Sequence, residues 1–409
     1  MFILVDPVST GRTLAEAFRE EGAECLHLYD ASLRAAYDAD DSPRTMVHEN
    51  LAKTLEVLGA LPVTAVIAAS EYGVLLADEL AAALGLPHHR PELAAARRDK
   101  ELMVRALERA GVPSARTAPV RTEDELDRVL SDWDSYPVMI KPRNSAGSDG
   151  CVISRDRHTA LRAFRDIVDR RNLMGEVNED VLVQEFLAGT QYIVNTVSLE
   201  GRHLVSDVYA ERIDHVDGAP VLRHIISRPL LEPAEAGLVD YVLECLDALG
   251  IREGAAHTEV MLTPSGPRLV EVNSRVMGPS LAPDAYHAAF GYSHQHLVAE
   301  RFLRPDEFAR RLELPYAATR SMAKIFLRPH RSGVLRSVDG ARVLRRMPGF
   351  HSIDRLPVVG EAVKDRYLTT GAGGIAYLVH EDEELLLSSL GFIHSLEDTG
   401  GFYRFDEQD

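Results

Sequence analysis

Long hydrophobic runs and cysteine are both scarce in this 409-residue sequence, and each shortage excludes a class of protein. No apolar run approaches the ~18–20 residues of a membrane span, so we expect no membrane partner. The start, MFILVDPVSTG, has no basic region and turns polar at Asp6, which predicts a first strand and not a signal peptide. The three cysteines have no ligand-like spacing: Cys25, Cys151 and Cys245. They predict thiols in a reducing cytoplasm, with a metal or disulfide role as the alternative.

Positive charge is also in the minority. Lysine and arginine number 45 against 63 aspartates and glutamates, which gives a formal net charge of −18. Because a nucleic-acid partner requires a basic face, we expect no nucleic-acid binding. Lysine itself occurs at only five positions: Lys53, Lys100, Lys141, Lys324 and Lys364. Where arginine is the default basic residue, a lysine marks a position that requires a compact ammonium group.

The chain is long enough for about two to four lobes, and residues 1–92 predict the first of them. Strand and helix patterns alternate there, which is typical of a parallel α/β domain. The expected strands are 2–5, 24–30 and 64–70, and the expected helices are 13–21, 43–59 and one that ends at Leu84. Ligands bind at the carboxyl ends of such strands, so Ser70 and Glu71 are candidate substrate contacts. Ser9 and Thr10 are further candidates, with helix capping as the alternative.

Three more regions are predicted after residue 92. They are a central lobe at 93–187, with a small lid lobe at about 114–187, an antiparallel-sheet lobe at 188–325, and an α+β subdomain at 326–409. Their expected helices include 91–111, 233–249 and 283–303. The predicted fold class is therefore α/β in the broad sense, with several α+β lobes.

The segments 257–262 and 268–275 alternate in polarity, so each predicts a strand with two unlike faces. Pairing about the TPSGP turn places Glu259 opposite Glu271 and His257 opposite Asn273. The other face is apolar and comprises Val260, Leu262, Val270 and Val272. Opposed carboxylates destabilise a sheet unless a cation lies between them. Mg²⁺ or Mn²⁺ suits the oxygen ligands Glu259, Glu271 and Asn273, and the alternative is a hairpin whose carboxylates point into water.

A second informative stretch is the apolar strand that ends at Lys141 and leads into the loop NSAGSDG at 144–150. Small residues expose backbone N–H groups to an anion and the lysine adds charge, so we predict a phosphate site, with an unliganded hairpin turn as the alternative. Lys100, near a helix start, is either a second phosphate contact or a solvated surface residue. The strand end at 184–187 predicts backbone groups that lie along the edge of an adenine base. The alternative is an ordinary strand end without a ligand.

Together, Lys100, Lys141 with its loop, QEFLAG, HTE and EVNSR resemble the ATP-grasp superfamily in order and spacing over roughly residues 1–325. VQEFLAGTQY and HTEVMLTPSGPRLVEVNSRVMG resemble more narrowly the L-amino-acid ligase branch, the carboxylate–amine ligases that make dipeptides. The residues after about 325 resemble the extra C-terminal subdomain of that branch. The resemblance implies an ATP-grasp fold with ATP bound between the small lobe and the antiparallel-sheet lobe.

The resemblance also implies residue roles. ATP would contact Lys100, Lys141, Ser145, Gly147, Ser148, Gln184, Glu185, Phe186, Leu187 and Gln191. The family commonly has a ribose-binding glutamate where this chain has Gln191, so ribose contact there stays open. Mg²⁺ would be held by Glu259, Glu271 and Asn273. Arg275 and Lys141 would be catalytic, Arg275 by stabilising the acyl-phosphate and tetrahedral species, and Gly278 and Ser280 would line the acyl site.

Other polar residues on the strands beside this site are candidate contacts to an amino-acid substrate. They are Glu211, Arg212, His224, Arg228 and His257, and packing or sheet-surface roles are the alternative for each.

The mechanism that follows has a carboxylate attack the γ-phosphorus of ATP, and an amine attack the resulting acyl phosphate. We expect an ATP-dependent ligase of amino acids or related small molecules. The alternatives are an ATP-grasp carboxylase or purine-pathway ligase, and a non-catalytic nucleotide-binding protein. A cytoplasmic location and a homodimer are further expectations, the homodimer by family analogy alone.

Overall fold

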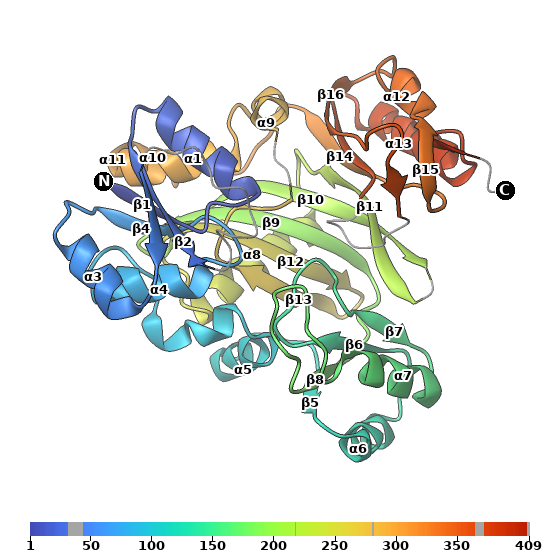
Figure 1. Ribbon diagram of the computed structural model, residues 1–409, viewed down its shortest axis with the longest axis horizontal. Helices are drawn as coiled ribbons and strands as arrows, with labels where there is room; N and C mark the ends of the chain where they lie inside the picture. Colours follow the sequence, from blue (N-terminus) through green and yellow to red (C-terminus); the bar gives the residue numbers. More distant parts are fainter. Residues whose placement is uncertain (32–43, 217, 280–281, 365–371, 407–409) are drawn as a thin grey trace.

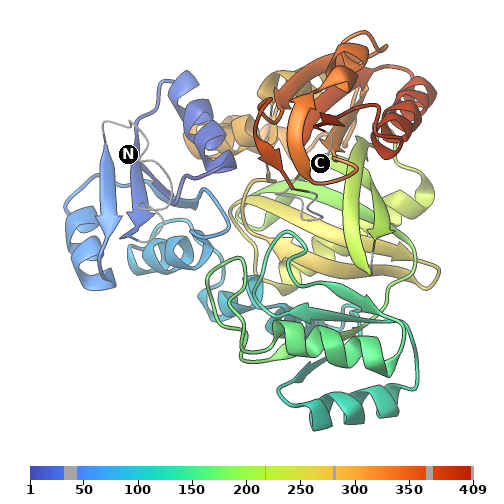
Figure 2. The same ribbon diagram turned by 45° about the vertical axis from the view of Figure 1, so that its right-hand side comes forward.

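The computed structural model describes residues 1–31, 44–216, 218–279, 282–364 and 372–406. Figures 1 and 2 show the N-terminal elements (blue) and a small lobe (green) beside one large central sheet, which the C-terminal elements (red) extend. Among the described residues, no helix combines the length and the apolar character that crossing a membrane requires.

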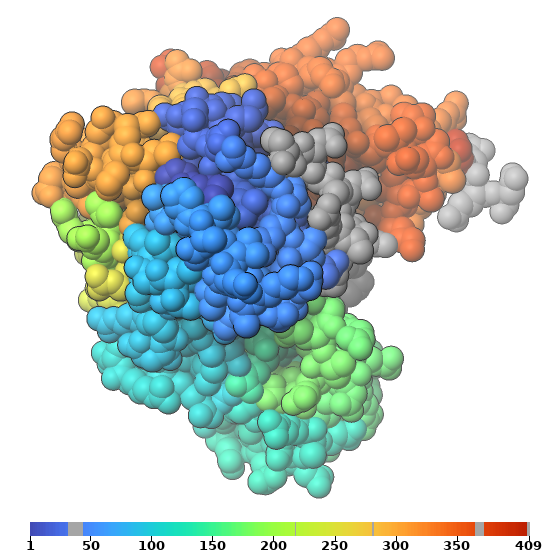
Figure 3. All heavy atoms as spheres, turned by 60° about the vertical axis from the view of Figure 1, so that its left-hand side comes forward, coloured from blue at the N-terminus to red at the C-terminus, as the bar shows by residue number. Residues whose placement is uncertain are grey.

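The N-terminal sheet is parallel, with the strand order β3-β2-β1-β4, as the alternating pattern predicted. Its strands are β1 (Phe2–Val5), β2 (Cys25–Asp30), β3 (Thr45–His48) and β4 (Ala65–Ala68). The accompanying helices are α1 (Thr10–Glu20), α3 (Leu51–Gly59) and α4 (Val74–Ala83). α1 packs on α10 (His294–Leu303) through a shared apolar core. The space-filling view accordingly shows the N-terminal residues against the orange segment that carries α10 (Figure 3).

The predicted helix at 43–59 is wrong in its first part. Thr45–His48 form β3, an edge strand that pairs in parallel with β2. The helix α3 begins only after Asn50, whose side chain accepts a hydrogen bond from the backbone N–H of Lys53. A strong N-cap residue in mid-segment therefore sets the start of the helix.

The predicted helix at 91–111 is also wrong in its first half, which forms two short 3-10 turns, η1 (Pro91–Leu93) and η2 (Ala95–Arg97). The α-helix α5 (Lys100–Ala110) follows. Its N-cap is Asp99, which accepts hydrogen bonds from the N–H groups of Glu101 and Leu102. Helix α5 ends at Gly111, which takes a left-handed conformation (φ 74°).

Arg97 in η2 connects three parts of the chain. Its side chain is fully buried and pairs with Asp78 of α4 at 2.7 Å. It also donates to the carbonyl oxygens of Arg90 and Leu249 at 3.1 and 3.0 Å. Burial raises the pKa of Asp78, and the charge of Arg97 opposes that rise. The pair therefore holds the N-terminal sheet against the end of the helix before the central hairpin.

We expect Arg97→Met to lower the free energy of unfolding by about 3–5 kcal/mol, because it leaves the carboxylate of Asp78 buried without its partner. Urea titration measures the loss. The double variant Arg97→Met/Asp78→Asn should recover part of it, since no unpaired charge remains. Lys53→Met is the control, because the Lys53–Glu49 pair is more than half exposed and should be worth under about 1 kcal/mol. Equal losses in Arg97→Met and Lys53→Met would contradict this account.

The small lobe is an antiparallel sheet with the strand order β5-β8-β6-β7. Its strands are β5 (Thr117–Val120), β6 (Val138–Pro142), β7 (Val152–Ser154) and β8 (Val181–Glu185). One face packs on α6 (Glu123–Trp133) and α7 (Arg157–Ile167). Since side chains alternate along a strand, Val138 and Ile140 enter this core while Met139 and Lys141 point to the opposite face.

The large sheet has eight strands in the order β13-β12-β9-β10-β11-β14-β18-β16. They are β9 (Thr190–Leu199), β10 (Arg202–Val216), β11 (Ala219–Ser227), β12 (Gly254–Thr263), β13 (Gly266–Asn273), β14 (Ser321–Leu327), β16 (Phe350–Arg355) and β18 (Gly374–His380). α8 (Pro233–Ala248) and α5 cover the β12–β13 end on one face. α13 (Glu383–Asp398) covers β14 and β18.

The remaining C-terminal elements are short. They are α12 (Asp339–Leu344) and a sheet of β15 (Gly333–Ser337), β17 (Ala362–Val363) and β19 (Arg404–Phe405). The single helix predicted at 283–303 is wrong, because α9 (Pro283–Phe290) stops at Gly291, which has φ 82°. α10 starts anew after its N-cap Ser293 and is followed by α11 (Pro305–Arg311).

Candidate functional site

The central hairpin has the predicted register. β12 and β13 pair Glu259 with Glu271 and His257 with Asn273. The register shifts after Glu259, so Val260 pairs with Leu269 and Val270 becomes the extra residue of a β-bulge. Leu269 takes the core position, while Val270 turns to the face of Glu271. The prediction that Val270 lies on the apolar core face was therefore wrong.

Lys100, at the start of α5, supplies the positive charge beside Glu271. Its Nζ lies 2.8 Å from Glu271 Oε2 and donates to the carbonyl oxygen of Ser145 at 2.8 Å. The amide of Asn273 donates to the other oxygen of Glu271 at 2.7 Å. Burial favours the neutral form of Glu271, but Lys100 and Asn273 outweigh it and lower its pKa to about 2. Lys100 thus ties the 144–150 loop to an ionised carboxylate of the hairpin.

Gln191, on β9 next to β12, occupies the space between two other carboxylates. Its Nε2 donates to Glu259 Oε2 at 3.0 Å, and it also hydrogen-bonds the side chain of Glu211. Burial, and then the charge of Glu259, raise the pKa of Glu211 well above its usual value. A glutamate at position 191 would add a third carboxylate here, whereas the amide of Gln191 donates hydrogen bonds. This accounts physically for glutamine at that position.

Lys141 projects from the open face of the small lobe. It is 4% exposed and donates to Gln184 Oε1 at 2.9 Å. Gln184 in turn donates to Thr117 Oγ1 at 2.9 Å, so β5, β8 and β6 together fix the ammonium. Burial lowers the pKa of Lys141. After β6 the loop folds back through Gly147 and Ser148, which both have left-handed backbone conformations (φ 62° and 63°).

A large cavity of about 620 Å³ lies between the small lobe and the large sheet. Every residue predicted to contact ATP lines it: Lys100, Lys141, Ser145, Gly147, Ser148, Gln184, Glu185, Phe186, Leu187 and Gln191. Glu259 and Glu271 also line it, whereas Asn273 is outside its lining and donates a hydrogen bond to Glu271. Gly189 allows the chain to pass close to β12, since a Cβ atom there would clash with the carbonyl oxygen of Leu262. The structure therefore brings the separate sequence motifs to one cavity.

A second cavity of about 230 Å³, the adjoining cavity, shares five lining residues with the large one: Gly147, Glu211, Leu222, Glu259 and Glu271. The predicted substrate contacts that line it are Ser9, Thr10, Ser70, Glu71, Glu211, His257, Arg275 and Gly278. Ser280 lies outside the described residues. Ser70 Oγ and Glu211 Oε2 are buried and have no hydrogen-bond partner among the described residues. His257 Nδ1 is 2.9 Å from Asn195 Oδ1, and burial lowers its pKa.

Arg275 follows β13 and is held from the N-terminal region. Its Nε donates to Glu71 Oε2 at 2.7 Å, and its Nη1 donates to the carbonyl oxygen of Val276 at 3.0 Å. Glu71 comes from the loop after β4 and also pairs with Arg98. Glu71 is thus a partner of Arg275 as well as a cavity residue. Sequence reasoning missed Arg98, although it directly precedes the helix cap Asp99.

His224 does not reach either cavity, which corrects its prediction as a substrate contact. The register of β10 and β11 shifts so that Ile213 pairs with Leu222 and Arg212 with His224. Arg223 is the extra residue, and the bulge turns His224 away from the face of Leu222. His224 instead stacks on His394 of α13, with 2.8 Å between Nδ1 and Nε2.

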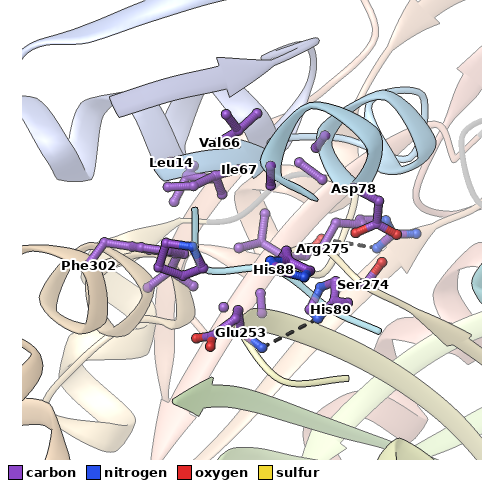
Figure 4. Close-up of a pocket in the computed structure, with 18 residues that line it drawn as sticks. Leu14, Val66, Ile67, Asp78, His88, His89, Glu253, Ser274, Arg275 and Phe302 are labelled. Carbon is purple, nitrogen blue, oxygen red and sulfur yellow. Dashed lines mark hydrogen bonds between the residues drawn. The ribbon is translucent and has the colours of Figure 1, made fainter. Parts of the chain in front are cut away.

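A third cavity adjoins Arg275 between the N-terminal sheet and the large sheet (Figure 4). Its lining includes Asp78, His89, Glu253 and Ser274, and His89 Nδ1 accepts from the N–H of Arg252 at 3.0 Å. At about 30 Å³ it has room for water but not for an amino acid. It belongs to the packing behind Arg275.

Comparison with known proteins identifies the family. An ATP-grasp domain profile matches residues 134–284, which contain Lys141, the loop, the 184–187 strand end and the hairpin. Over 410 residues the chain is 30% identical to dapdiamide A synthase of Enterobacter agglomerans, covering 97% of this chain and 96% of that protein. The chain belongs to the ATP-grasp amino-acid ligases.

A second relative and a solved structure are also similar to the chain. Alanine–anticapsin ligase of Bacillus subtilis (strain 168) is 26% identical over 271 residues, which cover 62% of this chain and 56% of that protein. The crystal structure of an L-amino acid ligase from Bacillus licheniformis covers 100% of this chain and 98% of its own, with a TM-score of 0.77 at 18% identity, and thus shares the fold. The predicted family, fold class and activity class, ATP-dependent amide-bond formation, are confirmed.

Proposed function

We propose that this ligase activates the carboxylate of an L-amino acid with ATP and joins it to the amine of a second amino acid or another small amine. The products would be an amide, ADP and phosphate. The observation that carries the proposal is the junction of the two cavities at Glu211, Glu259 and Glu271. ATP in the large cavity would present its γ-phosphate at this junction, within reach of a carboxylate in the adjoining cavity.

The lysines would offset phosphate charge. Lys141 is fixed by Gln184, and Lys100 links Ser145 of the 144–150 loop to the hairpin. Positioned cations of this kind stabilise the charge on a transferring phosphoryl group. The loop would also exclude water from the acyl phosphate, which water otherwise hydrolyses.

Glu259, Glu271 and Asn273 would hold the divalent cation. Two carboxylates and an amide oxygen form a donor set that fits Mg²⁺ or Mn²⁺, because hard cations prefer oxygen. The NH₂ group of Asn273 is engaged by Glu271, which leaves its carbonyl oxygen for a metal. Lys100 keeps Glu271 ionised, the form that coordination requires. When bound, the cation would neutralise charge on the phosphates.

Arg275 would stabilise the acyl phosphate and the oxyanion formed when the amine attacks. Glu71 fixes its Nε edge, so the guanidinium keeps one orientation at the wall of the adjoining cavity. Ser70 Oγ and Glu211 Oε2 would bind polar groups of the substrate, since each is buried there with no partner among the described residues. An ammonium group suits Glu211, because it would favour the ionised carboxylate.

The test is ATP turnover with Mg²⁺ and a panel of amino-acid pairs. We expect ADP and phosphate to appear when a donor and an acceptor are both present, with a product of the summed mass less one water. Reactions with one amino acid omitted are the control. Turnover that depends on bicarbonate and no amino acid would indicate a carboxylase, AMP in place of ADP would exclude the acyl phosphate, and ATP binding without turnover across the panel would indicate a non-catalytic protein.

A further inference from the structure

Lys324 is a buried lysine in the wall of the adjoining cavity. It lies at the centre of β14, is 0% exposed, and pairs in register with Ile225 of β11 and Tyr377 of β18. Side chains alternate along β14, so Ala323 and Ile325 enter the core beneath α13 while Lys324 and Phe326 line the cavity. The strand pattern therefore places one of only five lysines in the chain inside a substrate-sized space.

Apolar side chains line the cavity beside this ammonium, among them Ile225, Met277 and Phe326. It donates to the carbonyl oxygen of Pro279 and lies 5.3 Å from the ring centroid of Phe326. Burial lowers its pKa to about 7, against the opposing charge of Asp354 on β16. Placing a cation here costs free energy that a methionine of similar length would not. A role in ligand binding gives a physical reason for the lysine.

The position of Lys324 within the cavity indicates what it would bind. The carboxylates of Glu211, Glu259 and Glu271 are shared with the large cavity. In the strand order, Lys324 on β14 lies two strands from Glu211 on β10 and four strands from Glu259 on β12. Among the described residues that line this cavity, the lysine and arginine side chains are Arg275 and Lys324. Arg275 follows β13 and is bound to Glu71 next to the proposed acyl centre, so Lys324 is the cation on the β14 side of the cavity.

We propose that Lys324 binds a substrate carboxylate other than the one that is phosphorylated. We propose further that this carboxylate is the α-carboxylate of the acceptor, the amino acid whose amine attacks the acyl phosphate. The inference rests on the proposed function. An amino-acid acceptor brings its amine to the acyl phosphate while its own carboxylate stays ionised, and a charge-assisted hydrogen bond to an ammonium binds that carboxylate strongly. A carboxylate on the donor side chain is the other source of the same chemistry.

The experiment measures kcat/KM for an acceptor amino acid and for the same amino acid with its α-carboxylate converted to an amide, in wild type and in Lys324→Met. We expect wild type to prefer the free acid. Lys324→Met should lower kcat/KM for the acid by about 10- to 100-fold, the size of a lost hydrogen bond between charged groups. For the amide it should change kcat/KM by less than about threefold, so that the preference disappears. Lys324→Gln should behave in the same way, and Lys53→Met, on the exposed surface, should leave both values unchanged.

The remaining outcomes are separable. Replacing the acyl donor with its uncharged isostere measures whether the fall in kcat/KM in Lys324→Met depends on a carboxylate in the donor side chain. A fall that depends on it would support carboxylate binding by Lys324 and would assign the carboxylate to the donor. Equal losses for acid and amide would overturn the inference, because a residue that only holds Pro279 in place affects both acceptors alike. An unchanged acid preference in Lys324→Met, with wild type active, would overturn it as well. A wild type without turnover would overturn the proposed function, and the inference with it.

Discussion

Arg275→Ala is expected to abolish amide formation while ATP remains bound. Arg275 lines the adjoining cavity and is outside the lining of the large one, so the nucleotide contacts stay in place. Removing a donor from a developing oxyanion costs about 10²- to 10³-fold in kcat. The fold should tolerate the change, because Glu71 keeps its pairing with Arg98. Calorimetry of ATP binding with Mg²⁺, together with product mass spectrometry, measures both effects.

Two variants control this experiment. Arg275→Lys retains the charge but not the planar fork, so we expect intermediate activity. Arg202→Ala removes an arginine whose partner is Glu313, with both side chains more than half exposed, and should leave kcat unchanged. If ATP affinity falls by the same factor as turnover in Arg275→Ala, Arg275 binds nucleotide and the role proposed for it is wrong.

Glu271→Gln is expected to remove ATP turnover together with the metal-dependent binding of ATP. Glu271 is the ionised partner of Lys100 and the proposed ligand of the divalent cation. Loss of an interaction worth several kcal/mol implies a fall of about 10²- to 10³-fold in turnover. Glutamine keeps the shape of the side chain, so the hairpin register should persist. The diagnostic measurement is the rise in melting temperature that ATP with Mg²⁺ produces, which Glu271→Gln should lose and Arg275→Ala should keep.

Glu244→Gln, an exposed substitution on α8, is the matched control and should keep both turnover and the thermal shift. A Glu271→Gln protein that retains Mg²⁺-dependent turnover within about threefold of wild type would remove this carboxylate from the proposed metal site.

The hairpin shows how far alternation in a sequence predicts geometry. The pairing of Glu259 with Glu271 followed from symmetry about the turn, and the structure confirms it. The error at Val270 and the misplaced His224 both arise at β-bulges: Val270 is the extra residue of one bulge, and His224 follows the extra residue of another. A bulge depends on how two strands twist against each other, and period-2 alternation carries no sign of it.

The electrostatic partners were less predictable than the motifs. Lys100, Lys141 and the strand end at 184–187 were found from their order along the chain, and the fold brings them to one cavity. The contact between Glu71 and Arg275 joins residues 204 positions apart, and nothing local in either segment indicates it. The predicted first residues of two helices were wrong for a simpler reason. Asn50 and Asp99 are N-caps that lie inside the segments predicted as helical, and such capping residues can be recognised in a sequence.

The course of β14 has a consequence for engineering substrate preference by recombination. Ser321–Leu327 pair with β11 on one side and β18 on the other, so a junction between 325 and 326 would cut a central strand. A chimera joined in the 312–320 segment before β14 would transfer β14 with Lys324 and its neighbour β18 together, whereas β11 would come from the recipient. The parent of the C-terminal fragment would then determine the preference for the acceptor, while the recipient would supply the residues that activate the carboxylate with ATP.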